Sequence, residues 1–141
     1  MYKNDLMYEN KLSNALAMIT KQPALSAGIL EDSANVIAHI GCHALSTDRV
    51  GIWRTSDGAK TLNSVVYYDS STEKHAVLDS LDMSACVQYG ELLQTERLVI
   101  INGALDPNPL TPILDGYCPN LRALLDAPIR IGGKLVGVVC I

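Results

Sequence analysis

The C-terminal stretch, residues 124–141, constrains the fold of this chain more than any other part of the sequence. Two apolar runs rich in β-branched residues flank the pair Gly132-Gly133. Consecutive glycines accept the positive φ angles that a two-residue turn requires, so this pattern predicts a β-hairpin. The register set by such a turn pairs residues across the two strands as Ile131 with Lys134, Ile129 with Val136, and Ala127 with Val138.

Successive side chains of a strand point to opposite faces of the sheet, and a face that meets water is usually polar. Both faces of this predicted hairpin are largely apolar, so we expect both to be covered. Asp126 is the exception, because a carboxylate on a covered face is costly unless it is paired or hydrogen-bonded. By strand parity, Asp126 shares its face with Pro128, Arg130, Leu135 and Val139.

The composition indicates one globular domain. The chain has 141 residues, of which 48% are hydrophobic and 18% charged, and its net charge is −4. Without clustered Lys or Arg, this acidic balance argues against a nucleic-acid or anionic membrane partner. No apolar run approaches the roughly 18 residues of a membrane span, and the polar N-terminal segment does not resemble a signal peptide. We therefore expect a cytoplasmic protein.

The cysteines and histidines give weak signals for metal or redox chemistry. Four cysteines, at positions 42, 86, 118 and 140, occur singly, so neither a Cys-x-x-Cys zinc site nor a disulfide framework is indicated. His39 and His43 are four residues apart and would share one helix face, a geometry that can hold a metal ion. With no third ligand nearby in the sequence, we favour an ordinary helix face and expect no metal site.

Hydrophobic periodicity divides the remaining chain into helices and strands. Helices are predicted at about 4–21, 29–45 and 83–94, and strands at 50–55, 62–69 and 98–102. Four of the six prolines fall between Asn102 and Asn120, which predicts an ordered loop rather than regular structure. Because that loop also carries apolar residues, we expect it to fold over the sheet as a lid. The order of elements indicates an α+β domain with a central antiparallel sheet.

Four segments, taken in this order, resemble a GAF domain. They are Ala24–Gly28 (ALSAG), Asp48–Trp53 (DRVGIW), Glu96–Ile100 (ERLVI) and the C-terminal run Leu124–Val138, which includes LLDAPI and GGKLVGV. The resemblance extends from about Leu12 to Ile141. The chain is most similar to GAF domains that act as input modules of bacterial sensor histidine kinases and diguanylate cyclases.

The resemblance implies a GAF-like (PAS-like) antiparallel sheet of five to six strands, with N-terminal helices on one face and a lidded pocket on the other. It further implies that residues 1–141 form one GAF domain that lacks the usual C-terminal helix and the downstream output domain. The function implied is sensory binding of a small molecule, without catalysis by the domain itself.

The candidate ligand-binding residues are Asp126, Tyr117, Cys118, Tyr89 and Cys86. Tyrosine side chains offer an apolar ring and a polar tip to one site, and Asp126 could accept a hydrogen bond from a ligand. Two interpretations of Asp126 stay open. Either it is satisfied within the fold by backbone amides, Arg130 or Arg122, or it lines the pocket. Ordinary core packing is equally open for the other four residues.

The identity of the ligand or cofactor is left unknown by the sequence. The chain has no Phe, which disfavours the cyclic-nucleotide type of GAF site. Its one Cys-His pair, Cys42-His43, lies too early in the chain for the bilin-attachment type. Two alternatives to a sensor remain: a dimerisation module without a ligand, and a thiol-dependent reductase of free methionine sulfoxide. The apolar surface of the first helix also predicts a homodimer through that helix.

Overall fold

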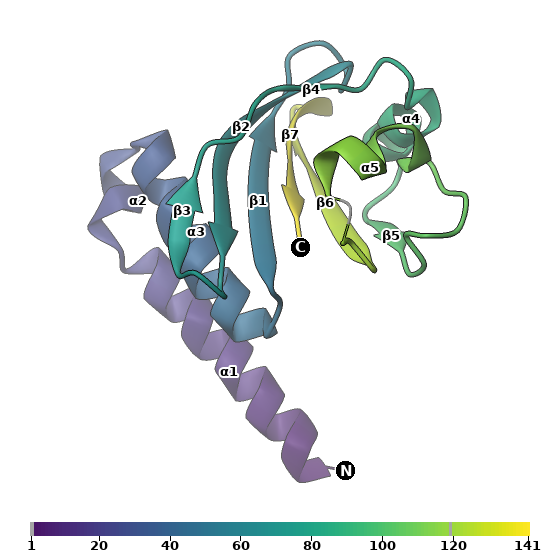
Figure 1. Ribbon diagram of the computed structural model, residues 1–141. Coiled ribbons are helices and arrows are strands. Elements are labelled where there is room, and N and C mark those ends of the chain that lie inside the picture. Colours follow the sequence, from purple (N-terminus) through teal and green to yellow (C-terminus); the bar gives the residue numbers. More distant parts are fainter. Residues whose placement is uncertain (1, 119) are drawn as a thin grey trace. The chain divides into compact units, whose positions relative to one another are not determined.

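The computed structural model describes residues 2–118 and 120–141 (Figure 1). The helices are α1 (Tyr2–Thr20), α2 (Pro23–Ala27), α3 (Leu30–Leu45), α4 (Val87–Thr95) and α5 (Thr111–Tyr117). The strands are β1 (Arg49–Arg54), β2 (Thr61–Asp69), β3 (Lys74–Ala76), β4 (Leu81–Asp82), β5 (Val99–Ile101), β6 (Leu124–Ile131) and β7 (Lys134–Cys140).

The strands pair in the order β3-β2-β1-β7-β6-β5, and β4 pairs with β2 off this path. The pairings of β2 with β3, β5 with β6, and β6 with β7 are antiparallel. The α+β class and the antiparallel sheet expected from the sequence are therefore confirmed.

Contacts divide the chain into two compact units, which we describe separately. The helical unit comprises Met1–Gly51 and Val65–Val77, and the hairpin unit comprises Ile52–Ser64 and Leu78–Ile141. In the helical unit, α3 packs against α1 and α2. The buried side chains of α3 are small, among them Ala34, Ala38 and Cys42.

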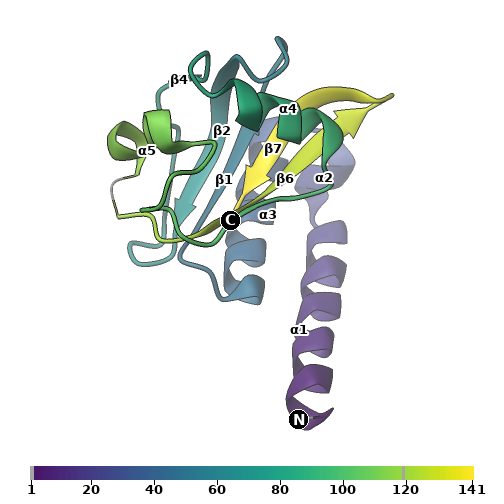
Figure 2. The same cartoon turned by 90° about the vertical axis from the view of Figure 1, so that its right-hand side faces the viewer.

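The hairpin unit holds a continuous apolar core. Its buried members come from β1, β2, β5, β6 and β7, from α4 and α5, and from the connecting segments. They include Trp53, Tyr89, Leu93, Leu114 and Val138. Figure 2 shows α4 lying across β6 and β7, and the two strands contact that helix directly. This packing places side chains of α4 against the face of β6 that carries Asp126.

The C-terminal hairpin forms as predicted at its turn but not along its whole length. Gly132 and Gly133 adopt φ angles of 58° and 79°, which confirms the turn. Ile131 pairs with Lys134 as expected. Beyond a bulge, the observed partners of Ile129 and Ala127 are shifted by one residue, to Gly137 and Val139.

The bulge corrects the predicted parity of β7. An extra residue in one strand moves every later side chain to the opposite face. Asp126 pairs with Cys140 and Pro128 with Val138, so these residues share a face, and Val139 points the other way. The expected placement of Val139 beside Asp126 was therefore wrong, whereas Leu135, before the bulge, lies where predicted.

Coverage of the hairpin also differs between its faces. The face of Asp126 is buried, with Leu124, Leu135 and Val138 in the core of the hairpin unit. On the other face Ile129 is 38% exposed and Ile131 71% exposed. The expectation that both faces are covered is not met at this end of the hairpin.

The proline-rich segment is more regular than predicted. It contains helix α5, which has a proline in its first turn, where the missing N–H costs no hydrogen bond. Leu110 and Leu114 are buried in the core of the hairpin unit, so the expected burial of this segment is confirmed. Pro119 lies outside the described residues.

Substitution of Gly137 tests the close approach between this residue and the backbone of Trp53, which accompanies the bulge. A Cβ atom added there would lie 2.6 Å from the backbone oxygen of Trp53. We expect Gly137→Ala to lower the free energy of unfolding by about 2 kcal/mol, measured by urea denaturation, because backbone cannot move aside as a side-chain tip can. The matched control is Gly41→Ala in α3, where a Cβ meets nothing within 4 Å. It should stabilise by up to about 1 kcal/mol. Equal effects of the two substitutions would contradict the close approach.

Candidate functional site

Tyr89 and Asp126 form the polar centre of the hairpin unit. Tyr89 projects from α4 and donates a hydrogen bond from its hydroxyl to Oδ2 of Asp126 on β6. Each of the two residues is only 1% exposed. On β6, Asp126 pairs with Val99 of the edge strand β5 on one side and with Cys140 of β7 on the other. Two of the five predicted site residues are thus brought into direct contact.

The carboxyl of Asp126 is incompletely satisfied. Among the described residues, Oδ1 is buried without a hydrogen-bond partner. Burial raises the pKa of Asp126 to about 6, although the hydrogen bond from Tyr89 and the nearby thiol of Cys140 favour the charged form. A buried carboxyl oxygen with no partner is unusual in a folded protein and requires an explanation.

Tyr89 is a permanent donor at this site. Its burial, and then the negative charges that Cys140 and Asp126 can carry, raise the pKa of Tyr89 far above its ordinary value. Burial likewise raises the pKa of the Cys140 thiol. At neutral pH the pair therefore consists of a protonated phenol and a carboxyl whose pKa is close to the pH of the solution.

The other three predicted residues surround this pair less directly. Cys86 is the residue that precedes α4, and it is buried in the same apolar core as Tyr89. Tyr117 of α5 packs against that core, with its ring 5.9 Å from the Trp53 ring in a T-shaped arrangement. Cys118 is buried at the C-terminal end of α5.

One residue that contributes to the site was not identified from the sequence. Cys140 was not among the predicted site residues, because the bulge that turns it toward Asp126 has no local sequence signal. Arg130 was considered a partner of Asp126, but its guanidinium instead donates to the carbonyl oxygens of Leu93 and Glu96 at the C-terminal end of α4. A cation at a helix C-terminus is favourable, so Arg130 holds α4 against β6.

A small pocket opens beside Cys86. It has a volume of about 230 Å³ and lies between the β1–β2 turn and α4, with Ala59, Lys60 and Glu91 among its lining residues. Ligand pockets are usually about 300 Å³ or larger. Of the five predicted site residues this pocket includes only Cys86.

Metal and membrane features were searched among the described residues. No group of three His, Cys, Asp or Glu side chains in that part of the chain could hold a metal ion. Within the same residues, every helix is too short or too polar to span a membrane.

Comparison with known proteins identifies the family. The model of the GAF domain matches residues 30–141. The match covers most of the chain, and the chain therefore belongs to the GAF domain family. Comparison with curated protein sequences finds no significant match.

Solved structures share this fold. The GAF domain of a phosphoenolpyruvate-protein phosphotransferase from Coxiella burnetii is 16% identical, with a TM-score of 0.65 over 94% of this chain and 75% of that one. A phycoerythrobilin-bound GAF domain from a cyanobacterial phytochrome is 16% identical, with a TM-score of 0.66 over 94% and 78%. A methyl-accepting chemotaxis protein is 15% identical, with a TM-score of 0.64 over 93% and 80%. These similarities confirm the GAF-like fold.

The buried carboxyl predicts a distinctive pH dependence of stability. Because the pKa of Asp126 is raised from 3.8 to about 6, the folded state holds this proton more tightly than the unfolded state. Its stabilising contribution is complete below about pH 4 and is lost as pH rises through about 6. We expect the Asp126→Asn variant to lack this loss. The free energy of unfolding of the variant minus that of the natural chain should therefore rise by about 3 kcal/mol from pH 4 to pH 8.

The measurement is urea denaturation of both chains across that pH range. Asp57→Asn is the matched control of opposite sign, since hydrogen bonds from Thr61 and Thr55 lower the pKa of Asp57. The stabilisation that Asp57 provides is present at neutral pH and is lost on acidification. A stability difference between Asp126→Asn and the natural chain that stays constant with pH would show that Asp126 is not desolvated.

Proposed function

We propose that this GAF domain is a sensory input module that binds a small molecule at the Tyr89–Asp126 pair. The single observation that carries the proposal is the buried Oδ1 of Asp126, which has no hydrogen-bond partner among the described residues. A ligand that donates a hydrogen bond to this oxygen would remove the cost of leaving it unsatisfied. Two of the similar solved structures support a sensory role. One is a GAF domain with bound phycoerythrobilin, and the other is a methyl-accepting chemotaxis protein.

The surroundings of the pair favour a partly apolar ligand with one donor group. Tyr117 and Cys86 supply apolar surface with weakly polar tips, and Cys118 lies at the end of the helix that carries Tyr117. Such a mixture of apolar walls and a few oriented polar groups is typical of small-molecule sites. The host protein in this proposal is a bacterial signalling protein with a kinase, cyclase or similar output.

The thiol-reductase alternative receives less support. Catalytic cysteines react as thiolates, and their pKa is generally lowered by a nearby positive charge or a helix N-terminus. Burial instead raises the pKa of Cys86, and that of Cys140 is raised strongly. These two thiols therefore stay protonated at neutral pH, which favours binding over catalysis.

The binding proposal is tested by thermal melting with a defined panel of probes: adenine and guanine nucleotides, free amino acids, and biliverdin. We expect at least one class to raise Tm, because a ligand that binds only the folded state stabilises it. The shift should shrink in Tyr89→Phe, which removes one hydroxyl. It should persist in Ser84→Ala, a control that removes an exposed hydroxyl near the same helix. No shift with any probe would favour the ligand-free dimerisation module.

We also propose a homodimer formed through α1. Large apolar side chains are exposed along this helix, including Met7 at 71% and Leu16 at 64%. An apolar groove of about 580 Å³ runs between α1 and α3 and is lined by Met7, Met18 and Ile40. Apolar surface of this extent marks an interface, and a two-fold pair is the commonest way to cover it.

The dimer is tested by light scattering at micromolar concentration. The natural chain should have about twice the monomer mass of 15.2 kDa. The double variant Leu6→Glu, Leu16→Glu should return to the monomer mass, because charges cannot be buried in an apolar interface without a partner. Val77→Glu is the matched control, an exposed apolar residue of the same unit that is not part of α1. A monomeric natural chain, or a dimer that survives the double substitution, would contradict this interface.

A further inference from the structure

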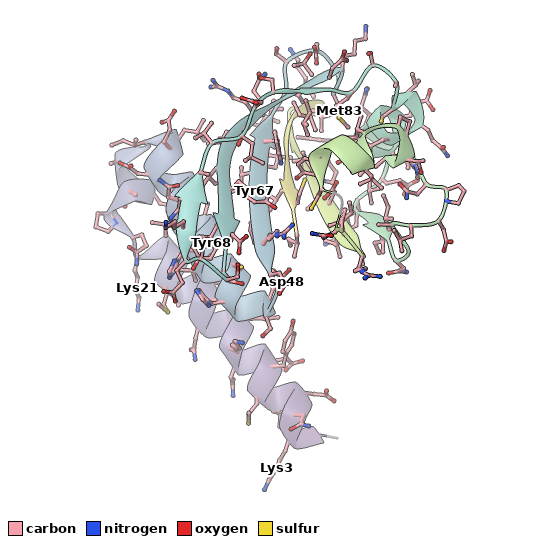
Figure 3. The ribbon with its side chains drawn as sticks, viewed as in Figure 1. Lys3, Lys21, Asp48, Tyr67, Tyr68 and Met83 are labelled. Atoms are coloured by element: carbon pink, nitrogen blue, oxygen red, sulfur yellow. The ribbon has the colours of Figure 1, made fainter. Side chains whose placement is uncertain are left out.

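Asn102 is the only asparagine of the chain that is followed by glycine. It comes directly after β5, outside regular secondary structure, and both Asn102 and Gly103 are exposed to solvent. The segment that joins β5 to α5 runs along the surface of the hairpin unit (Figure 3). Asparagine is one of the chemically labile residue types, and the residue that follows it decides how easily it reacts.

The reaction open to Asn102 is attack by the backbone nitrogen of Gly103 on the side-chain carbonyl carbon of Asn102. A bond forms between this nitrogen and Cγ and closes a five-membered succinimide ring. The side-chain amide group leaves and takes up the proton of the Gly103 N–H, which gives ammonia. Water then opens the ring at either carbonyl and gives aspartate or isoaspartate. Both reacting groups belong to one chain, so they need no encounter in solution, and water is the only co-reactant.

The surroundings leave both reacting groups free. Neither the side chain of Asn102 nor the N–H of Gly103 makes a hydrogen bond with any residue that the structure describes. Gly103 has no Cβ atom to hinder the approach of Cγ, and glycine reaches backbone angles that are closed to other residues. The attacking nitrogen is therefore accessible, and its peptide can turn toward the side chain.

Asn108, in the same connecting segment, is protected in two ways. Its side-chain amide donates to the carbonyl oxygens of Ala104 and Asp106, at 3.2 and 2.9 Å. The next residue is Pro109, whose nitrogen carries no hydrogen and cannot form the ring. Asn108 therefore serves as an internal control for Asn102.

We propose that Asn102 is a site of spontaneous covalent modification, at which the side-chain amide is converted through a succinimide to aspartate and isoaspartate. An ordinary aspartate is ionised at neutral pH, so each product adds one negative charge. The carboxylate of Asp106 already lies close by, since its Oδ2 would be 2.8 Å from a Cβ atom on Gly103. The modification therefore places two like charges in one turn.

Isoaspartate also lengthens the backbone by one carbon atom, at a place held by a contact on each side. On one side, the buried Ile101 pairs with Leu124 of β6. On the other side, the N–H of Ala104 donates to the carbonyl oxygen of Arg122, at 2.9 Å. Only residues 102 and 103 lie between these contacts, so an added backbone atom strains one of them. The modification thus loosens the segment that leads to α5.

The test is mass spectrometry of the whole folded chain during long incubation at neutral and mildly alkaline pH. Trypsin cleavage after Arg97 and Arg122 then releases one peptide that contains both Asn102 and Asn108. We expect the mass change of an amide that becomes an acid at Asn102, with isoaspartate among the products, and no change at Asn108. Ion exchange separates the modified chains by their added charge, and these chains should have a lower Tm.

Two variants separate the proposed mechanism from simple exposure. Gly103→Ala adds a Cβ atom beside the attacking nitrogen and should slow the conversion by about tenfold. The added atom meets only the end of the flexible Asp106 side chain, so the fold is kept. Asn102→Gln should abolish the conversion at this position, because its longer side chain would have to close a larger ring. Far-ultraviolet circular dichroism confirms that each variant is folded.

Three outcomes would overturn the proposal. The first is a natural chain in which Asn102 stays unmodified after long incubation. The second is equal conversion of Asn102 and Asn108, because Asn108 cannot form the ring. The third is an unchanged rate in Gly103→Ala. Modified chains with the same Tm as the natural chain would contradict the strain at the two contacts.

Discussion

The hydrogen bond from Tyr89 to Asp126 is the interaction on which the hairpin unit depends. A carboxyl buried in an apolar core must be held by a donor, and here the donor arrives from a helix that crosses the strand. Arg130 makes a second polar connection between the same two elements, at the C-terminal end of α4. These two contacts fix the orientation of α4 on β6, and with it the position of the side chains that surround Asp126.

This arrangement concentrates the polar chemistry of the hairpin unit at one point. Burial keeps Tyr89 and the thiols of Cys86 and Cys140 protonated, whereas the carboxyl of Asp126 titrates near neutrality. A site of this kind is suited to recognising a donor group and poorly suited to nucleophilic chemistry. Our proposal of a sensory rather than catalytic GAF domain follows from that balance.

The β7 bulge illustrates where prediction from sequence ended. The Gly132-Gly133 turn has a local cause, since glycine accepts positive φ, and it was predicted from the sequence. The one-residue shift beyond it accompanies the close approach of Gly137 to the backbone of Trp53, a residue far away in the chain. Because side chains alternate along a strand, that shift decides that Cys140, and not Val139, accompanies Asp126.

The sequence by itself determined the class of fold, the approximate helices and strands, and the buried position of Asp126, because periodicity and turn chemistry depend on neighbouring residues. Only the tertiary structure decided which groups meet. Asp126 finds its donor 37 positions away in Tyr89. His75 joins the histidines of α3 only because β3 pairs with β2 over the ring of Tyr68. Contacts between residues so far apart in the sequence depend on how helices and strands pack and on the register in which strands pair. Neither is encoded in any short stretch of the chain.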